Sequence, residues 1–433
     1  MVRVLYIFVL VSLLSLSVVN AQNEMHWKKV FHGQVGPYTE EASMVQWFSA
    51  DTVFILSTDS FYCSPDRGET FAASPVNSDW FKFDFASSQI GFAVGWLGLV
   101  KKSTNSGQSW YNSFYMTQRP MRSVDFITPV QGIITGDGGG IFRTNSGGSS
   151  WQDIPSVHPN FLIVVKWITP NIVMIGGDYV MLRSIDAGLS FSFVSSSGSF
   201  GWIYDIDFYD PEKIHTGRAY SAVQYDNHFI IATGGLNKLH RSTDYGLTWT
   251  DISSPVAGGK FKELDIADNG RAFVYGSGSL WESKDEGRSW HQYLLPQDLV
   301  PEVFDFQDSY NLFGMRTLDA HSPLYFIKYE YQNEDITILT PKRSGHIFSN
   351  KQRIPVTWRS NKVEYVNIEY TTDNGSTWYL GATVPAAEEY HGLLLPDVLN
   401  KECFVRVRSA SNPTVGDTCD YSFTVQPEVW QIQ

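Results

Sequence analysis

Five aspartates recur at the centre of short apolar segments, and carboxylates that converge in this way could bind a cation or act as a general acid and base. Phe83-Asp84-Phe85 is a typical segment, and two further segments have Gln46 and Lys166 at the same position. Each carboxylate could instead accept a backbone N–H of a neighbouring strand. We favour this structural role over a cation site or a catalytic pair. The series comprises Asp84, Asp125, Asp207, Asp265 and Asp305.

A second group places aromatic rings beside acids, amides and guanidinium groups in segments that we expect to be loops. Such rings stack on the C–H faces of sugars or pack against a peptide. Any one of these aromatics could also pack in the interior between sheets. The group comprises Trp80, Trp96, Arg119, Arg122, Asp137, Asp178, Tyr179, Trp202, Tyr204 and Asn237.

Four acids are weak candidates for catalysis. A glycoside hydrolase needs two carboxylates about 5–10 Å apart in an open pocket. The candidates that we expect near the loops are Asp137, Asp178, Asp205 and Asp207.

A turn motif with the template S-x-D-x-G-x-T-W repeats along the chain, and its fullest copy spans Ser242–Trp249. The Asp or Asn side chain can accept the N–H groups of a tight turn, and the glycine adopts a positive φ without a clash. We therefore predict a structural role for the acid or amide of each turn. These residues are Asp66, Asn105, Asp186, Asp244, Asp285 and Asp373.

The spacing of the motif indicates how the chain is organised. A period of ~40 residues with one aromatic-ended turn per unit is typical of four-stranded propeller blades. One interval is longer, and we place its insert at residues 210–228. The aspartate-centred segments predict seven blades. We expect His26–Phe31 to supply the fourth strand that the last blade lacks and so to close the ring. The copies begin at Ser64, Ser103, Thr144, Ser184, Ser242 and Ser283.

Residues 336–428 contain short alternating segments such as Val366–Tyr370, which are typical of a small Ig-like β-sandwich. The predicted fold is therefore all-β, with a seven-bladed β-propeller at residues 22–331 followed by a small β-sandwich. We expect Cys403 and Cys419 to begin the two strands of one hairpin. Because antiparallel strands begin at opposite ends, this placement disfavours a disulfide.

The first 21 residues have the pattern of a secretory signal peptide, with an apolar run and small residues before a cleavage site at Ala21. We expect a protein that is secreted, periplasmic or at the cell surface, without membrane insertion after cleavage. The formal charge of −13 argues against nucleic acid as a partner, because phosphate binding needs a basic face. No motif for metal, phosphate or nucleophilic chemistry occurs, so we expect no cofactor.

The turn motif resembles that of Asp-box (BNR) repeat propellers over residues 26–330. The stretch Gly91–Trp110 is most similar to propellers of the photosystem II stability and assembly factor type, which also occur in exported bacterial proteins. Asp boxes are found in sialidases, xyloglucan endoglucanases and sortilin-type receptors too, so the resemblance implies a fold and not one function. Unlike sialidases, this chain has its Arg353-Ile354-Pro355 after the propeller, and unlike the endoglucanases it has a single propeller.

These observations predict an exported, non-catalytic binding or assembly propeller that engages a protein or a glycan through its loop face. The alternative is a sialidase-like or endoglucanase-like glycoside hydrolase that uses carboxylates near the propeller axis.

Overall fold

The computed structural model describes most of the chain outside the first 26 residues. The predicted signal peptide and the insert at residues 210–228 lie outside the described residues. No helix among the described residues is long and apolar enough to cross a membrane. The described residues are 27–38, 42–49, 51–57, 60–75, 80–115, 118–194, 200–209, 229–234, 238–252, 261–267, 269–276, 279–293, 303–308, 310–317, 323–331, 333–341, 346–349, 352–395 and 402–426.

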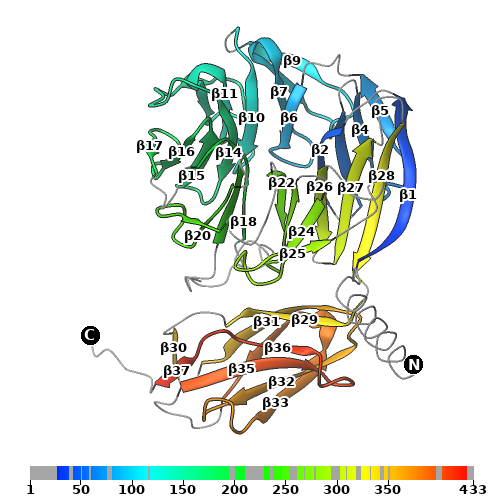
Figure 1. Ribbon diagram of the computed structural model, residues 1–433, viewed down its shortest axis with the longest axis vertical. Helices are drawn as coiled ribbons and strands as arrows, with labels where there is room; N and C mark the ends of the chain where they lie inside the picture. Colours follow the sequence, from blue (N-terminus) through cyan, green and yellow to red (C-terminus); the bar gives the residue numbers. More distant parts are fainter. Residues whose placement is uncertain are drawn as a thin grey trace, which may run out of the picture.

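Most described strands belong to antiparallel sheets of four strands, which we call blades (Figure 1). Each blade is named after its inner strand, so that the sheet of β2, β3, β4 and β5 is the β2 blade. In six blades the strand order along the sheet is the order along the chain. These strands are β2 (Ala42–Trp47), β3 (Val53–Ser57), β4 (Ser60–Ser64) and β5 (Ala72–Pro75); β6 (Trp80–Phe85), β7 (Gly91–Gly95), β8 (Leu99–Ser103) and β9 (Tyr111–Tyr115); β10 (Met121–Phe126), β11 (Gly132–Gly136), β12 (Ile141–Thr144) and β13 (Gln152–Asp153); β14 (Leu162–Trp167), β15 (Val173–Gly177), β16 (Val180–Ser184) and β17 (Ser192–Phe193); β18 (Ile203–Tyr209), β19 (Phe229–Gly234), β20 (Lys238–Ser242) and β21 (Thr250–Asp251); and β22 (Phe261–Ile266), β23 (Ala272–Gly276), β24 (Ser279–Ser283) and β25 (His291–Tyr293).

One further four-stranded sheet joins the two ends of this region. Its order is β1-β28-β27-β26, so the N-terminal strand is its outermost strand. The residues of β1 pair antiparallel with β28 from Trp27 opposite Tyr331 to Tyr38 opposite Pro323. The strands are β26 (Val303–Asp308), β27 (Asn311–Thr317), β28 (Pro323–Tyr331) and β1 (Trp27–Tyr38). Figure 1 shows the inner strands β2, β6, β10, β14, β18, β22 and β26 gathered around a common centre.

The apolar core lies between neighbouring blades. In five blades the second strand is buried along its whole length, as in β7 and β11. Aromatic rings from adjacent blades then stack on one another. Phe54 of the β2 blade stacks on Phe85 of the β6 blade with 4.3 Å between ring centroids, and Phe92 stacks on Phe126 in the same way at 4.5 Å. Burial of these large rings holds each blade against the next.

The repeated turn motif forms the connection from the third to the fourth strand. In the fullest copy, the Asp244 carboxylate accepts the Ser242 hydroxyl at 2.8 Å and the Thr248 N–H at 2.8 Å, and the Ser242 hydroxyl accepts the Gly246 N–H at 2.9 Å. Against the effect of partial burial, the hydrogen bonds of Thr248 and Ser242 lower the pKa of Asp244. Gly246 has a φ of 76°, and the preceding Tyr245 is also left-handed at 55°. The predicted turn chemistry is therefore present in this motif.

A basic residue before the turn connects each blade to the next in the middle of the array. Arg143 donates from Nε to the Ala187 carbonyl at 2.7 Å, and Arg183 donates to the Tyr245 carbonyl at 2.7 Å. The equivalent position of the β22 blade is Glu282, which is buried and bonds Arg271 at 3.3 Å instead. In the β22 blade, an acid thus stands where the blades in the middle of the array have the basic residue.

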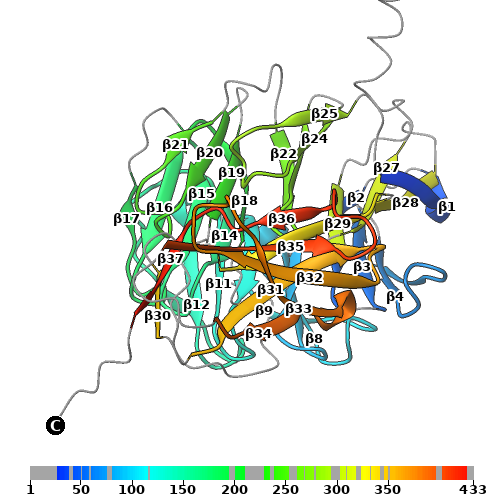
Figure 2. The same cartoon turned by 90° about the horizontal axis from the view of Figure 1, so that it is seen from below.

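The C-terminal region forms two sheets around one apolar core that includes Trp358, Ile368 and Val405. Figure 1 shows these sheets below the propeller, and in Figure 2 they lie in front of it. One sheet contains β29 (Asp335–Thr340), β31 (Ile354–Asn361) and β34 (Tyr390–Leu393). The other contains β30 (His346–Ser349), β37 (Phe423–Gln426), β35 (Glu402–Ser409), β32 (Tyr365–Thr371), β33 (Tyr379–Pro385) and β36 (Gly416–Thr418), and a short 3₁₀ turn, η5 (Ala386–Glu388), follows β33.

The expected placement of the two C-terminal cysteines is wrong in one respect. Cys419 follows β36 and does not begin a strand, and its N–H donates to the Val405 carbonyl at 2.9 Å. Cys419 therefore lies opposite Val405, near the middle of β35 and two residues beyond Cys403. All three cysteines of the chain are among the described residues, and no disulfide joins any of them.

A buried charge cluster joins the propeller to the C-terminal sheets. The Arg271 guanidinium bonds Glu282 of β24 at 3.3 Å and Asp335 of β29 at 2.7 Å, and it stacks over the Tyr331 ring at 4.1 Å. Although burial opposes it, the carboxylates of Asp335 and Glu282 raise the pKa of Arg271. The contact is at the end of the β22 blade that carries its turn motif, which is the opposite end from the connection between the second and third strands.

Candidate functional site

A β-bulge near the start of the inner strand inserts one extra residue in six of the blades. In the β10 blade, Met121 pairs with Gly136 and Ser123 with Thr135, so Arg122 is the extra residue. Bulges commonly redirect a side chain toward a functional surface. The same irregularity recurs in six blades, where the extra residues are Ser43, Phe81, Arg122, Ile163, Tyr204 and Lys262.

The connections between second and third strands lie at the same end of the blades. In three successive blades their tips occupy equivalent positions, which are Leu97 in η1 (Trp96–Gly98), Gly138 in η2 (Asp137–Gly139) and Tyr179. All three have a left-handed backbone, with φ of 54°, 70° and 55°. Leu97 is 66% exposed and Tyr179 is 56% exposed. We call these tips and the bulge residues together the loop face.

Arg122 is the centre of the charge and ring contacts on the loop face. Its Nε and Nη2 donate to the two carboxylate oxygens of Asp137 at 2.7 and 2.9 Å. Its guanidinium carbon lies 4.8 Å from the Phe81 ring centroid, 5.7 Å from that of Trp96 and 5.9 Å from that of Phe161. A bidentate, ring-flanked guanidinium has a fixed orientation. Side chains from the β6, β10 and β14 blades are thereby held as one unit.

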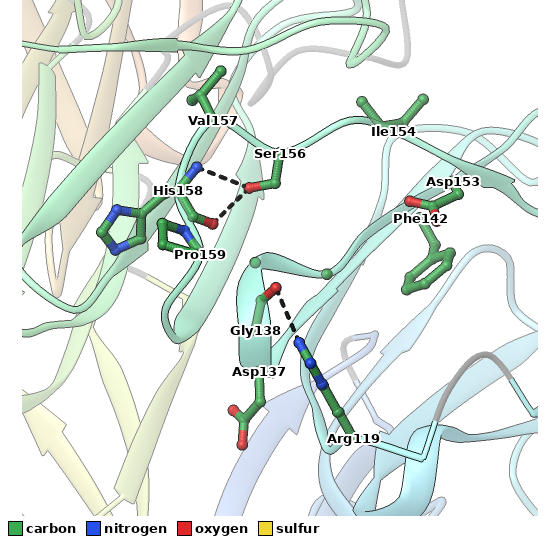
Figure 3. A pocket seen from close by; sticks show the side chains of 12 residues that line it. Arg119, Asp137, Gly138, Phe142, Asp153, Ile154, Ser156, Val157, His158 and Pro159 are labelled. Atoms are coloured by element: carbon green, nitrogen blue, oxygen red, sulfur yellow. Dashed lines mark hydrogen bonds between the residues drawn. The ribbon is translucent and has the colours of Figure 1, made fainter.

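A cavity of about 470 Å³ opens beside this unit, between the β10 and β14 blades (Figure 3). Gly138 and Arg119 form one side, where Arg119 Nη1 is 3.4 Å from the Gly138 carbonyl oxygen. The segment from Ser156 to Pro159 forms the other, and the Ser156 hydroxyl there donates to the His158 carbonyl at 2.8 Å. The Gly139 N–H donates to the Asn160 carbonyl at 2.6 Å and so connects the two sides.

Most of the predicted loop residues lie at or next to this unit. Asp178 accepts the Asn160 amide at 3.1 Å and bridges in the backbone to Trp202. The Trp202 ring is 5.9 Å from that of Phe161. Tyr204 is the bulge residue of the β18 blade and is half-buried. Asn237 lies outside the described residues.

Trp80 is not available as a surface ligand, contrary to the prediction. It is buried, and its ring lies 5.0 Å from that of Trp110 and 6.3 Å from that of Phe61. The reason is the bulge at Phe81, which moves the loop-facing position one residue along the strand. Phe81, Leu97 and Phe161 were missed in the sequence. Phe81 stands three residues before Asp84, as Arg122 stands three before Asp125, and this spacing was the available signal.

The recurring inner-strand aspartates bond the next blade. Asp84 accepts the Phe126 N–H at 2.7 Å, Asp125 accepts the Trp167 N–H at 2.5 Å, and Asp207 accepts the Ile266 N–H at 2.9 Å. Asp305 accepts the Trp47 N–H and so spans the last and first blades of the array. Asp265 bonds Asp305 and the N–H of its own neighbour Ile266.

The axis carries mixed charge. Lys166 lies 3.3 Å from Asp207, and Lys82 lies 3.8 Å from Asp205. Burial and the nearby Asp125 carboxylate raise the pKa of Asp84 to about 7, and burial raises that of Asp305 to about 6. Burial and Asp205 also raise the pKa of Glu263. Among the described residues, no group of three His, Cys, Asp or Glu side chains is arranged to hold a metal ion.

The four weak catalytic candidates all have partners within the protein. The Asp137 carboxylate is bound by Arg122, and that of Asp178 by Asn160. Asp205 accepts the Leu264 N–H at 3.2 Å, and Asp207 accepts Ile266 and pairs with Lys166. These contacts orient and hold neighbouring elements. A general acid or base must reach a proton on a substrate, and the contacts seen here are directed into the protein.

Comparisons with known proteins identify the fold. No family model and no curated protein matches the chain. A structure of YCF48 bound to D1 peptide matches with 14% identity over 71% of this chain and 98% of that chain, at a TM-score of 0.54. YCF48 from Cyanidioschyzon merolae matches at 16% identity, 71% and 99% coverage and 0.53, and the RRP9 WD40 repeats at 10%, 70% and 97% and 0.52. At such identities the likeness shows the fold alone: repeated four-stranded antiparallel sheets arranged as in β-propellers.

Proposed function

We propose that this chain is an exported, non-catalytic propeller that binds a partner protein through its loop face. The observation that carries the proposal is the pair Leu97 and Tyr179, which are large, exposed and held in a left-handed backbone beside a rigid Arg122–Asp137 unit. Left-handed backbone costs about 1–2 kcal/mol for a residue other than glycine. Such strain gathers at functional surfaces, and exposed apolar residues that cluster mark interaction sites.

The domain organisation belongs to the same proposal. The seven four-stranded sheets of the described residues would be the complete set of blades, at residues 22–331, and β1 would close the ring. Residues 336–428 would form an Ig-like sandwich, and residues 1–21 a signal peptide that directs the protein to the medium, the periplasm or the cell surface. The strand order β1-β28-β27-β26 and the common core of the C-terminal sheets support this organisation.

A protein partner fits the loop face better than a glycan does. The ring faces nearest the axis are already turned toward Arg122, whereas sugar binding uses a free ring face. The exposed groups Leu97 and Tyr179 suit apolar side chains of a protein. YCF48, which has a similar fold, was solved with a bound D1 peptide. The hydrolase alternative has no support of this kind, because its candidate carboxylates are directed at partners within the protein.

Affinity capture with matched variants tests the proposal. The exported chain would be immobilised and exposed to envelope and medium fractions of the organism that makes it. Leu97→Asp places a charge on the loop face, and Leu247→Asp is its control, because Leu247 is 59% exposed at the opposite end of the blades. We expect the captured proteins to be retained by wild type and Leu247→Asp and lost with Leu97→Asp. Equal capture by all three would refute the loop face as the binding surface. A parallel glycan array that shows binding with turnover would refute the non-catalytic function.

A further inference from the structure

The cavity beside Gly138 belongs to the middle one of three successive blades that carry equivalent loop tips. Leu97, Gly138 and Tyr179 hold the same position in three successive blades, and the middle position has no side chain. A Cβ at Gly138 would lie 1.7 Å from Arg119 Nη1, and one at Gly139 would lie 2.0 Å from the His158 carbonyl oxygen. The two glycines therefore let Arg119 and the His158 segment approach the backbone closely. Because neither glycine has a side chain, the hollow is not filled at these positions.

The buried walls of the hollow are apolar. Phe142 and Ile154 are buried walls, and Val157 is 45% exposed at the opening. The Asp137 carboxylate is already paired with Arg122. The lining also includes Arg119 and Asp153, which carry opposite charges, and His158, whose ring points away from Gly138 (Figure 3). An apolar group placed against Phe142 and Ile154 gives up no hydrogen bonds to water, so the buried walls favour an uncharged apolar occupant.

The size of the hollow also restricts its occupant. A volume of about 470 Å³ falls at the small end of ligand pockets in proteins, so it suits one bulky side chain and the backbone next to it. Protein interfaces concentrate their affinity in such anchors, which insert into a pocket while the surrounding contacts exclude water. Leu97 and Tyr179 hold the position of Gly138 in the two blades next to the β10 blade, so they are the exposed side chains from which such surrounding contacts can come.

We propose that the hollow at Gly138 receives one bulky, uncharged apolar side chain from an extended segment of the partner protein, with Leu97 and Tyr179 against the segment on either side. This proposal rests on the proposed function and adds the chemistry of the partner. The partner segment carries an aromatic or large aliphatic residue, and neither an acidic nor a basic residue takes its place.

Gly140 offers a clean way to fill the hollow. It lines the cavity, its φ of −61° suits any residue, and an added Cβ would meet its nearest neighbours at ordinary distances of 3.4–3.6 Å. Gly140→Phe would place a ring in the space, and Gly140→Ala is the control that adds one carbon. Val157→Asp puts a charge on the wall of the hollow without adding a larger side chain. Val130→Asp is its control, because Val130 is 50% exposed at the opposite end of the blades.

The probe is a library of random dodecapeptides displayed on phage and selected on the full exported chain. We expect the selected peptides to share an apolar residue at one position. Gly140→Phe and Val157→Asp should each weaken their binding by about tenfold or more, the effect of losing one buried anchor. Gly140→Ala and Val130→Asp should bind as wild type does.

Selected peptides without a common apolar residue, or peptides that bind Gly140→Phe and Val157→Asp as well as wild type, would overturn the proposal. An absence of selected peptides would overturn it too. Failure of the proposed function has a different outcome, which is equal capture of native proteins by wild type, Leu97→Asp and Leu247→Asp. If the native partners are lost with Leu97→Asp but retained by Gly140→Phe, the loop face binds proteins and the hollow is not the anchor site.

Discussion

The axial carboxylates make the stability of the propeller depend on pH, and Asp84 is the residue at which the dependence can be measured. Burial and the Asp125 carboxylate raise the pKa of Asp84 to about 7 in the folded protein, against ~3.9 in an unfolded chain. The folded state therefore holds this proton more tightly than the unfolded state does. The resulting stabilisation is fully present below pH ~4 and is lost as the pH rises through about 7.

The size of this effect follows from the difference between the two pKa values. A difference of about three units corresponds to about 4 kcal/mol for an independent and fully buried carboxyl. Asp84 is half-buried and interacts with both Asp125 and Lys166. Between pH 5 and pH 8 about two of these three units are crossed, which corresponds to about 2.6 kcal/mol for an independent carboxyl. We therefore expect roughly half of that, or about 1.3 kcal/mol, over this pH range.

Asp84→Asn isolates the contribution. The asparagine keeps an oxygen that can accept the Phe126 N–H, as Asp84 does at 2.7 Å, but it does not ionise. Urea unfolding would be followed by tryptophan fluorescence at pH 5, 6, 7 and 8 and constant ionic strength. We expect the free energy of unfolding of wild type to fall toward pH 8, and that of Asp84→Asn to fall by about 1.3 kcal/mol less.

Asp285→Asn is the control for charge removal elsewhere. Against the effect of partial burial, hydrogen bonds from Ser289 lower the pKa of Asp285, so its contribution is present above pH ~4 and lost only in acid. This variant should be less stable than wild type by the same amount from pH 5 to pH 8. The reasoning is refuted if Asp84→Asn keeps the wild-type pH dependence, or if wild type gains stability as the pH rises from 5 to 8.

Three other substitutions test separate parts of the structure. Leu97→Asn should raise the free energy of unfolding by about 0.5–1 kcal/mol, because asparagine tolerates a left-handed backbone better than leucine; a clear loss in calorimetry would contradict the strain. Gly188→Ala should lower it by roughly 1–3 kcal/mol, since its Cβ at a φ of 79° would lie 2.3 Å from Ile133 Cδ1, and an unchanged urea midpoint would contradict this. Arg271→Met should cost about 3–5 kcal/mol, because it removes the guanidinium that pairs with buried Glu282 and with Asp335; adding Glu282→Gln should recover part of the loss, and a double variant no more stable than the single one would show that the charge of Glu282 is not the cause.

The repeat of the turn motif made the fold predictable. Asp244 and its equivalents build the same local turn wherever they occur, so their spacing reports the length of a blade. The inner-strand aspartates were predictable for the same reason, because Asp84 and Asp125 make the same bond to the next blade. Features that depend on one repeating local geometry can be predicted from a single sequence.

The loop face was only partly predictable, because a bulge and a contact between blades determine it. The bulge at Phe81 buries Trp80 and leaves the next residue half-buried on the loop face, and no residue type marks that shift in the sequence. Phe161 joins the unit through Arg122 of another blade. The hollow at Gly138 depends on the distance between two blades, which the order of residues along one blade does not contain.

The pairing of β1 with β28 has a consequence for synthesis and transport. The two strands are joined in one sheet although nearly the whole propeller separates them along the chain. Contacts so distant in sequence form late, because a long loop must close first. During synthesis, and during the export that we propose, β1 is thus available long before β28 can pair with it. Truncation after the β22 blade would therefore remove β26, β27 and β28 and leave β1 without its partner strand, and it would not simply give a smaller propeller.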